Sequence, residues 1–261
     1  MSNQIHPTAV VAKGASLGSN IQIGPYSVID EHVSIADGCI IGPHVHITGH
    51  TTIGKENRFH SGAVIGDAPQ DLKYADEPTR VIIGDANTFR EHVTIHRSNK
   101  LEEDTTIGSH GLFMANSHVG HNSHISDHVI LANGALLGGH VTVADRVFIS
   151  GNCLAHQFVR IGRLALMQGG SGISKDLPPF TIARGDNGIC GLNVVGLRRA
   201  GFNPEQRTEL KQTYRFLFRS GLRLKEAISQ AKAQFQSDPA KELITFAENT
   251  SRGICSDTGK D

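Results

Sequence analysis

Apolar residues recur at every sixth position along most of the chain from its start to Ile173. The longest uninterrupted series consists of Ile107, Phe113, Val119, Ile125, Leu131, Leu137, Val143, Ile149, Ala155, Ile161, Met167 and Ile173. An earlier series with the same spacing consists of Ile5, Val11, Leu17, Ile23, Ile29, Ile35, Ile41, Ile47, Ile53, Phe59 and Ile65. A period of six fits neither an α-helix nor a plain strand, so it predicts a solenoid of hexapeptide repeats.

Three hexads would close one coil, and stacked coils would bury a continuous core made of the sixth-position side chains. Glycine often follows the inward aliphatic residue, as at Gly18, Gly120 and Gly138. We expect these glycines to supply backbone angles at tight corners that other residues resist.

Two segments, 66–82 and 96–106, lack the repeat, while Ile83, Phe89 and Ile95 keep it between them. Long loops inside a compact domain are more often functional than idle. We therefore expect residues that serve the function of the protein in both loops.

The pattern changes after Ile173, and residues 203–250 read as helical. Asn203 is placed to cap a helix that has Pro204 at its first position, and Ser220-Gly221 would end it. Two more helices are predicted over 222–235 and 238–249. The predicted fold is mainly β, with a solenoid domain over residues 1–190 that carries loops 66–82 and 96–106, and a helical domain over residues 191–261.

Charge is balanced over the whole chain but not along it. The 261 residues include 25 Lys and Arg and 25 Asp and Glu, whereas residues 198–235 hold nine basic and three acidic residues. This basic stretch either attracts an acidic partner or is a solvated helix face. No nucleic-acid-binding motif accompanies it, so we expect no nucleic acid as partner.

The chain shows no signal peptide and no apolar run long enough to cross a bilayer, which predicts a protein without a membrane span. The four cysteines have neither metal-type nor disulfide-type spacing. We therefore expect a cytoplasmic protein. A solenoid of this kind would expose flat sides, so we also expect it to form an oligomer.

Histidines separated in the sequence are brought together by the coil of three hexads. Positions 121, 139 and 157 fall on successive coils, which gathers His118, His121, His140 and His156 into one band. Three interpretations stay open on these residues alone. In the first, the histidines are polar residues at the corners of the solenoid. In the second, they bind zinc, although no acidic or cysteine partner is obvious to complete the ligand set. In the third, one histidine acts as a general base toward a hydroxyl that attacks an acyl group.

Several motifs outside the band are more specific. They are QDLKY at 70–74, EPTR at 77–80, TIHR at 94–97, AHQF at 155–158, DLPPF at 176–180, GLNVVGLRRAGF at 191–202 and SRGI at 251–254. Together they resemble the UDP-N-acetylglucosamine O-acyltransferase family of lipid A biosynthesis over nearly the whole chain. The resemblance implies a left-handed parallel β-helix and a homotrimer with active sites between subunits. It also implies transfer of an (R)-3-hydroxyacyl chain from acyl carrier protein to the 3-hydroxyl of UDP-N-acetylglucosamine.

The resemblance also assigns roles to single residues. His121 matches the general base, and Gly139 matches the glycine whose amide holds the thioester oxyanion. The substrate-binding positions that it implies are Gln70, Asp71, Lys73, His118, His140, His156, Gln157, Gly169, Asn193 and Arg199. Gly169 matches the end stop of the acyl groove, and a glycine there predicts a long acyl chain. The basic stretch 198–235 gains acyl carrier protein as its candidate partner, and neither a cofactor nor a metal ion is expected.

Two positions depart from the family pattern. Asn122 stands where the family often has aspartate, and an amide can orient an imidazole without stabilising an imidazolium by charge. Val195 stands where the family has a glutamate that contacts the nucleotide. The alternatives are a related N-acyltransferase with a 3-amino acceptor, a zinc-containing γ-carbonic anhydrase-like protein, and a scaffold without catalytic activity.

Overall fold

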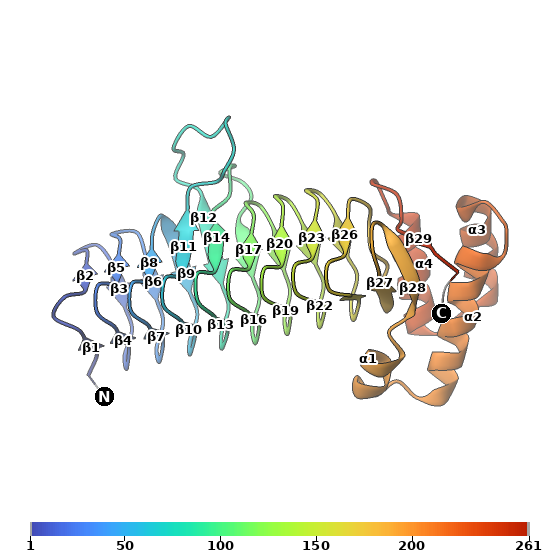
Figure 1. Cartoon of the computed structure of the whole chain (residues 1–261), viewed down its shortest axis with the longest axis horizontal. Helices are drawn as coiled ribbons and strands as arrows, with labels where there is room; N and C mark the ends of the chain where they lie inside the picture. The colour runs from blue at the N-terminus through green and yellow to red at the C-terminus, as the bar shows by residue number, and fades with distance from the viewer. Residues whose placement is uncertain (1, 260–261) are drawn as a thin grey trace.

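The computed structural model describes residues 2–259, which form a long solenoid with helices packed at one end (Figure 1). Short strands separated by turns stack into sheets of 12, 9 and 8 strands, parallel except where β27 meets β28. Along the uninterrupted solenoid each strand pairs with the strand three further along the chain, as β17 does with β20. His118 is thereby opposite Leu136, which lies three hexads further on, and the predicted coil of three hexads is confirmed.

The strands have the following bounds. The 12-stranded sheet contains β1 (Gln4–Ile5), β4 (Gln22–Ile23), β7 (Ile40–Ile41), β10 (Arg58–Phe59), β13 (Thr88–Phe89), β16 (Leu112–Phe113), β19 (Ile130–Leu131), β22 (Phe148–Ile149), β25 (Leu166–Met167), β27 (Thr181–Ala183), β28 (Gly188–Leu192) and β29 (Ser256–Asp257). The 9-stranded sheet contains β2 (Val10–Val11), β5 (Val28–Ile29), β8 (His46–Ile47), β11 (Val64–Asp67), β14 (Thr94–His96), β17 (His118–Val119), β20 (Leu136–Leu137), β23 (Leu154–Ala155) and β26 (Gly172–Ile173). The 8-stranded sheet contains β3 (Ser16–Leu17), β6 (Ser34–Ile35), β9 (His50–Ile53), β12 (Arg80–Ile83), β15 (Thr105–Ile107), β18 (His124–Ile125), β21 (Thr142–Val143) and β24 (Arg160–Ile161).

The sixth-position side chains form the core of the solenoid, as predicted. From Ile23 to Ile173 each of them is buried. Ile5 is 44% exposed, because it lies in the first coil, which has a neighbour on one side only. Three aromatic rings, Phe59, Phe89 and Phe113, stack inside the core with centroids 4.8 Å apart.

The glycines that follow inward residues are required by close packing between coils. A Cβ added at Gly120 would lie 2.7 Å from the carbonyl carbon of Gly138 in the next coil. The left-handed backbone angles of the corners occur elsewhere, for example at Asn122 (φ 58) and His140 (φ 60). The expectation that these glycines serve corner angles is therefore wrong, because approach of the neighbouring backbone excludes a side chain there.

The two segments without the repeat leave the solenoid as loops between β11 and β12 and between β14 and β15 (Figure 1). Across the first loop Arg58 pairs with Thr88, and across the second Thr88 pairs with Leu112, so both separations exceed three hexads. Arg97 anchors the first loop because its guanidinium donates to the Gly66 carbonyl oxygen and to the Tyr74 hydroxyl, each at 2.9 Å. Strand pairing resumes in register beyond the loops, and a single register shift, between Ile65 and Asp67, marks the pairing of β11 with β14 where the loops leave.

The helices follow the last strands of the solenoid. They are α1 (Val194–Arg199), α2 (Pro204–Arg219), α3 (Leu224–Gln234) and α4 (Asp238–Glu248). Asn203 forms a capping box with Gln206 at the start of α2, which confirms the predicted start of that helix. The short α1 was not predicted, nor was the return of β29 to pair with β28. Within residues 2–259, every helix is too short or too polar to span a bilayer.

Candidate active site

A cleft of about 670 Å³ lies over the sheet that contains β17, β20, β23 and β26. Six of the residues predicted to serve the site line it, namely Gln70, His118, His121, Gly139, His156 and Gln157. Leu136 and Leu154 give the cleft an apolar wall and are 42% and 52% exposed. The cleft therefore offers imidazole groups beside an aliphatic surface.

His121 lies at the corner that follows β17, and Gly139 lies against its ring. A Cβ added at Gly139 would be 2.6 Å from His121 Nε2, so only a glycine leaves room for the ring in this position. Within residues 2–259 the Gly139 N–H donates no hydrogen bond. His140 follows Gly139, and its ring packs edge-on against that of His121 and stacks on Phe158. The proximity predicted from the coil register is confirmed.

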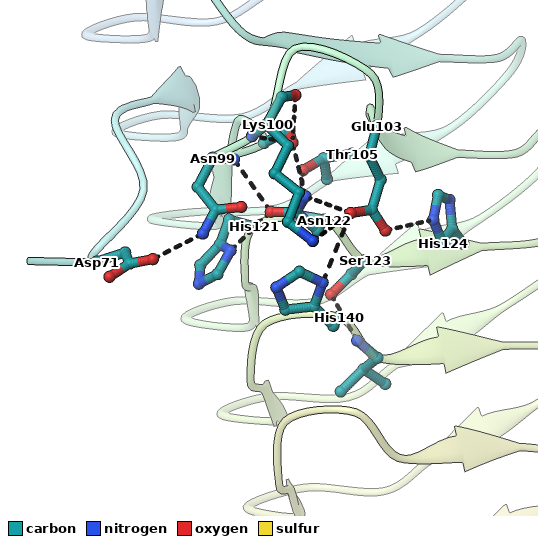
Figure 2. Close-up of polar contacts among 12 residues, drawn as sticks. Asp71, Asn99, Lys100, Glu103, Thr105, His121, Asn122, Ser123, His124 and His140 are labelled. Carbon is teal, nitrogen blue, oxygen red and sulfur yellow. Dashed lines mark hydrogen bonds and ion pairs between the residues drawn. The ribbon is translucent and has the colours of Figure 1, made fainter. Parts of the chain in front are cut away.

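The side chain of Asn122 fixes the tautomer of His121. Asn122 Oδ1 lies 2.7 Å from His121 Nδ1 and accepts the backbone N–H of Asn99 at 3.0 Å. Because a backbone N–H can only donate, the atom that faces it must be the amide oxygen. His121 Nδ1 therefore carries the hydrogen that it donates to this oxygen (Figure 2). The Nε2 atom, beside Gly139, keeps the lone pair of the neutral imidazole.

The amide nitrogen of Asn122 is equally constrained. It donates to Ser98 Oγ at 2.7 Å and to Glu103 Oε2 at 2.8 Å. The Asn122 side chain is fully buried and makes two hydrogen bonds at each end. A flipped amide would set its oxygen against the Glu103 carboxylate and its nitrogen against the Asn99 N–H. The orientation of Asn122 is thus determined by its surroundings.

Two further histidines lie behind His121 and stay neutral at pH 7. Burial, together with repulsion from His96 and His121, lowers the pKa of His118 to about 4. Burial also lowers the pKa of His96, although Asp67 opposes this effect. His118 Nδ1 is 2.7 Å from Thr94 Oγ1, and its ring packs edge-on against that of His96. The two rings therefore present hydrogen-bonding groups without positive charge.

The first loop brings Asp71 next to this cluster. Asp71 Oδ2 accepts a hydrogen bond from Asn99 Nδ2 at 2.6 Å, and Asp71 Oδ1 accepts the backbone N–H of Lys73 at 3.0 Å. These two hydrogen bonds, that from Lys73 first, hold the pKa of Asp71 below its ordinary value. Asp71 is therefore ionised at neutral pH, while the Lys73 side chain is exposed on the same loop.

The other six predicted residues do not line the cleft: Asp71, Lys73 and His140 lie beside it, and three more lie farther away. Gly169 is exposed at the corner between β25 and β26. Asn193 is buried, caps α1 through the Gly196 N–H and donates to the Leu164 carbonyl oxygen, each at 2.9 Å. Arg199 is exposed at the last residue of α1. Within one copy of the chain, these positions are not brought to His121.

A second groove, of about 790 Å³, lies between β27–β28 and the helices α1 and α2. Six basic side chains line it, and they are Arg184, Arg198, Arg207, Lys211, Arg215 and Arg219. Those on α2 are spaced four residues apart, which places them on one face of the helix. Five of the nine basic residues of the stretch 198–235 therefore line one groove, although Arg219 is paired with Asp257.

Reasoning from the sequence missed four residues around His121. They are His96, Ser98, Asn99 and Glu103, all at or within the second loop. The TIHR motif contains His96, but a count of hexads cannot cross a loop that changes the separation of paired residues. Among residues 2–259, no set of three or more His, Cys, Asp or Glu side chains is arranged to hold a metal ion.

Comparison with known protein families matches two parts of the chain. Residues 176–255 match the family described as UDP N-acetylglucosamine O-acyltransferase, domain 2. Residues 32–67 match the family described as bacterial transferase hexapeptide (six repeats). The first match covers the end of the solenoid and the helices, and the second covers hexads near its beginning.

Individual relatives match over nearly their whole length. An acyl-[acyl-carrier-protein]–UDP-N-acetylglucosamine O-acyltransferase of Anaeromyxobacter sp. is 47% identical over 96% of this chain and 98% of its own. The crystal structure of Francisella novicida UDP-N-acetylglucosamine acyltransferase superposes with a TM-score of 0.94 at 35% identity, over 98% of this chain and 95% of the other. The crystal structure of UDP-N-acetylglucosamine O-acyltransferase from Moraxella catarrhalis superposes with a TM-score of 0.92 at 37% identity, over 96% of this chain and 99% of the other.

Proposed function

The chain belongs to the acyl-[acyl-carrier-protein]–UDP-N-acetylglucosamine O-acyltransferase family, and we propose that His121 is its general base. The fold is a left-handed parallel β-helix of hexapeptide repeats with C-terminal helices. The protein is an enzyme that transfers an acyl group from acyl carrier protein to UDP-N-acetylglucosamine. We further propose that the acyl group is an (R)-3-hydroxyacyl chain, the acceptor is the sugar 3-hydroxyl, and the reaction begins lipid A biosynthesis in the cytoplasm.

One observation carries the assignment of the base. His121 Nδ1 donates to Asn122 Oδ1 at 2.7 Å, which leaves the Nε2 lone pair in the cleft next to Gly139. In the proposed reaction Nε2 takes the proton of the sugar hydroxyl while its oxygen attacks the thioester carbonyl carbon. The carbonyl π electrons move onto the oxygen and form a tetrahedral oxyanion.

The Gly139 N–H is the donor that we assign to this oxyanion. It lies beside His121 and donates no hydrogen bond within the described residues, so it is available to a substrate oxygen. Collapse of the intermediate re-forms the carbonyl and breaks the carbon–sulfur bond. The departing thiolate takes the proton from the His121 imidazolium, which returns the base to its neutral form. A single oxyanion donor of this kind accounts for roughly 10²–10³ in kcat.

The other predicted residues bind the substrates in this proposal. Gln70, Asp71 and Lys73 come from the first loop, whose Asp71 is tied to Asn99 beside the base. His118, His140, His156 and Gln157 surround the reacting groups with polar atoms. The acyl chain lies along the exposed Leu136 and Leu154, and the family resemblance assigns Gly169 to the end of the groove, where the lack of a side chain would leave it long.

We propose that the enzyme is a homotrimer with its active sites between subunits. Asn193 and Arg199 lie outside the cleft of their own chain, and the apolar Leu136 and Leu154 face outward from the sheet. Association of adjacent solenoids would cover this face and bring helical-domain residues to a neighbouring cleft. Arg199 then provides a planar guanidinium for the nucleotide phosphates.

The cationic surface on α2 is the docking site that we assign to acyl carrier protein. Arg207, Lys211 and Arg215 lie on one helix face, and the two last are exposed. A row of positive charge attracts an acidic protein and orients it during encounter. The carrier's prosthetic arm would then reach the cleft from the helical end of the solenoid.

The proposed function is tested by an assay of UDP-N-acetylglucosamine with acyl carrier proteins that bear hydroxyacyl chains of increasing length. We expect His121→Ala to lower kcat by about 10²–10⁴, the contribution that a positioned general base makes. His128→Ala is the matched control, because His128 is an exposed histidine at another corner and stacks on His110. A His121→Ala variant that keeps native turnover while His128→Ala does the same would remove His121 from the mechanism.

A further inference from the structure

The second loop brings a carboxylate, that of Glu103, to the active site. Glu103 lies between β14 and β15, and its Oε2 accepts the side-chain N–H of Asn122 at 2.8 Å. Asn122 in turn accepts the hydrogen of His121 Nδ1 at 2.7 Å. Carboxylate, amide and imidazole therefore form an unbroken chain of hydrogen bonds (Figure 2).

The direction of every hydrogen bond in this chain is fixed. Asn122 Oδ1 accepts from Asn99 N–H and from His121, so its nitrogen must face Ser98 and Glu103. An electron-rich partner on the amide nitrogen polarises the amide and makes its oxygen a stronger acceptor. The effect of a negative charge at Glu103 is thereby passed to His121 Nδ1, although Asn122 itself cannot ionise.

Glu103 carries its charge at neutral pH. Burial raises the pKa of its carboxyl, but the hydrogen bond from Asn122 and the neighbouring His140, His124 and Lys100 together hold the pKa below its ordinary value. Its contacts with Lys100 and His140 are 3.8 Å and that with His124 is 3.5 Å, all longer than the bond to Asn122. The closest partner of the carboxylate is therefore the amide that touches the base.

We propose that Glu103 is a positioning residue that completes a His121–Asn122–Glu103 relay and supplies, through Asn122, the negative charge that stabilises the His121 imidazolium. This inference rests on the proposed role of His121 as general base. It restores to this chain the charge that is missing where asparagine follows the catalytic histidine. The carboxylate acts from the neighbouring loop instead of from residue 122.

Other charged and titratable groups surround the relay and also influence the titration of His121. Asp71 and Lys73 approach from the first loop, His96 and His118 from the neighbouring strands, and His140 from the next coil. Of these groups His140 contacts Glu103, at 3.8 Å, so its titration is followed together with that of His121. A change in the titration of His121 that His140 does not share reports the charge of Glu103.

Glu103→Gln separates charge from geometry, because its amide oxygen can still accept the Asn122 N–H. We expect the pKa of His121 to fall by about half a unit to one unit, the effect of removing one charge two hydrogen bonds away. The acid limb of kcat/KM against pH would move to lower pH by the same amount. We expect kcat to fall roughly 10-fold with KM for the sugar nucleotide unchanged, since the charge is needed when imidazolium forms. Glu102→Gln removes the charge of the adjacent exposed residue and is the matched control.

Asn122→Asp provides the complementary test. Alone, it sets two carboxylates at the 2.8 Å separation of the present bond, where they repel and share a proton. Combined with Glu103→Gln, the new aspartate receives a side-chain N–H from the new glutamine and faces His121 directly. Aspartate also tolerates the left-handed angle at this position (φ 58). We therefore expect the double variant to exceed both single variants in kcat and to return the acid limb to its native position.

The relay is refuted if Glu103→Gln leaves the His121 titration at its native value, or if the double variant is no better than the weaker single one. The titration is followed by NMR of the imidazole nitrogens in the folded protein, which needs no turnover. Failure of the proposed function is a different result, namely His121→Ala with native kcat. A purely structural role for Glu103 would lower the melting temperature without moving the His121 pKa, and that outcome also overturns the proposal.

Discussion

Gly139→Ala tests the arrangement of base and oxyanion donor most directly. The added Cβ would lie 2.6 Å from His121 Nε2 and 2.7 Å from Cε1. Comfortable contact between such atoms begins near ~3.5 Å, so the ring must recede by roughly 1 Å. That movement lengthens the 2.7 Å bond to Asn122 beyond hydrogen-bonding distance. A misplacement of ~1 Å costs about 10²-fold in rate, so we expect kcat to fall by at least that factor.

Stability supplies the internal control for this substitution. The corner itself accepts a side chain, since Ala115 occupies the equivalent turn position before Asn116 (φ 59). We expect Gly139→Ala to lower the free energy of unfolding by about 1–3 kcal/mol through overpacking against the ring. In a His121→Ala background the same change should cost less than about 0.5 kcal/mol. Native kcat in Gly139→Ala, measured with acyl carrier protein as donor, would refute the geometry.

Three further outcomes are expected. Arg207→Glu combined with Lys211→Glu should raise KM for acyl carrier protein at least ~10-fold, with the largest effect at low salt; an unchanged KM would move the docking site elsewhere. Gly169→Met should shift the preferred donor to a shorter acyl chain, and a preference unchanged across the donor series would contradict the assigned groove. The folded-state pKa of His118, about 4, lies below its ordinary value, so unfolding takes up a proton between these two values. Stability from this group is present above pH ~6.5 and is lost as the pH falls toward ~4, by up to roughly 3 kcal/mol, and urea unfolding of His118→Gln should show a weaker pH dependence.

The spacing of apolar residues was sufficient to predict the solenoid and to bring His121 beside Gly139. Inside an uninterrupted run of hexads, each residue lies against the one three hexads away, so counting residues predicts which positions are neighbours. His140, which follows the residue that this count sets opposite His121, donates its N–H to the His121 carbonyl oxygen. The identity of the reaction came from the resemblance of motifs, since the repeat alone is common to many functions.

The count fails wherever a loop intervenes. Glu103 and Asn99 reach Asn122 from a segment without the repeat, and their contacts depend on the path of the loop. The glycines after inward residues were misread for a different reason. Their requirement arises from the backbone of the next coil, as between Gly120 and Gly138, which is a tertiary contact that local sequence does not encode.

The two loops depart from and rejoin the solenoid without disturbing the pairing along one of its sheets. β10, β13 and β16 stack in register, and Phe59, Phe89 and Phe113 remain in contact, although the intervening lengths differ. The stability of the fold thus comes from the stacked repeats, while the loops add residues to the active site. Such an architecture can acquire, retune or lose an activity by changing the length and content of a corner, with the spine that supports it left unaltered.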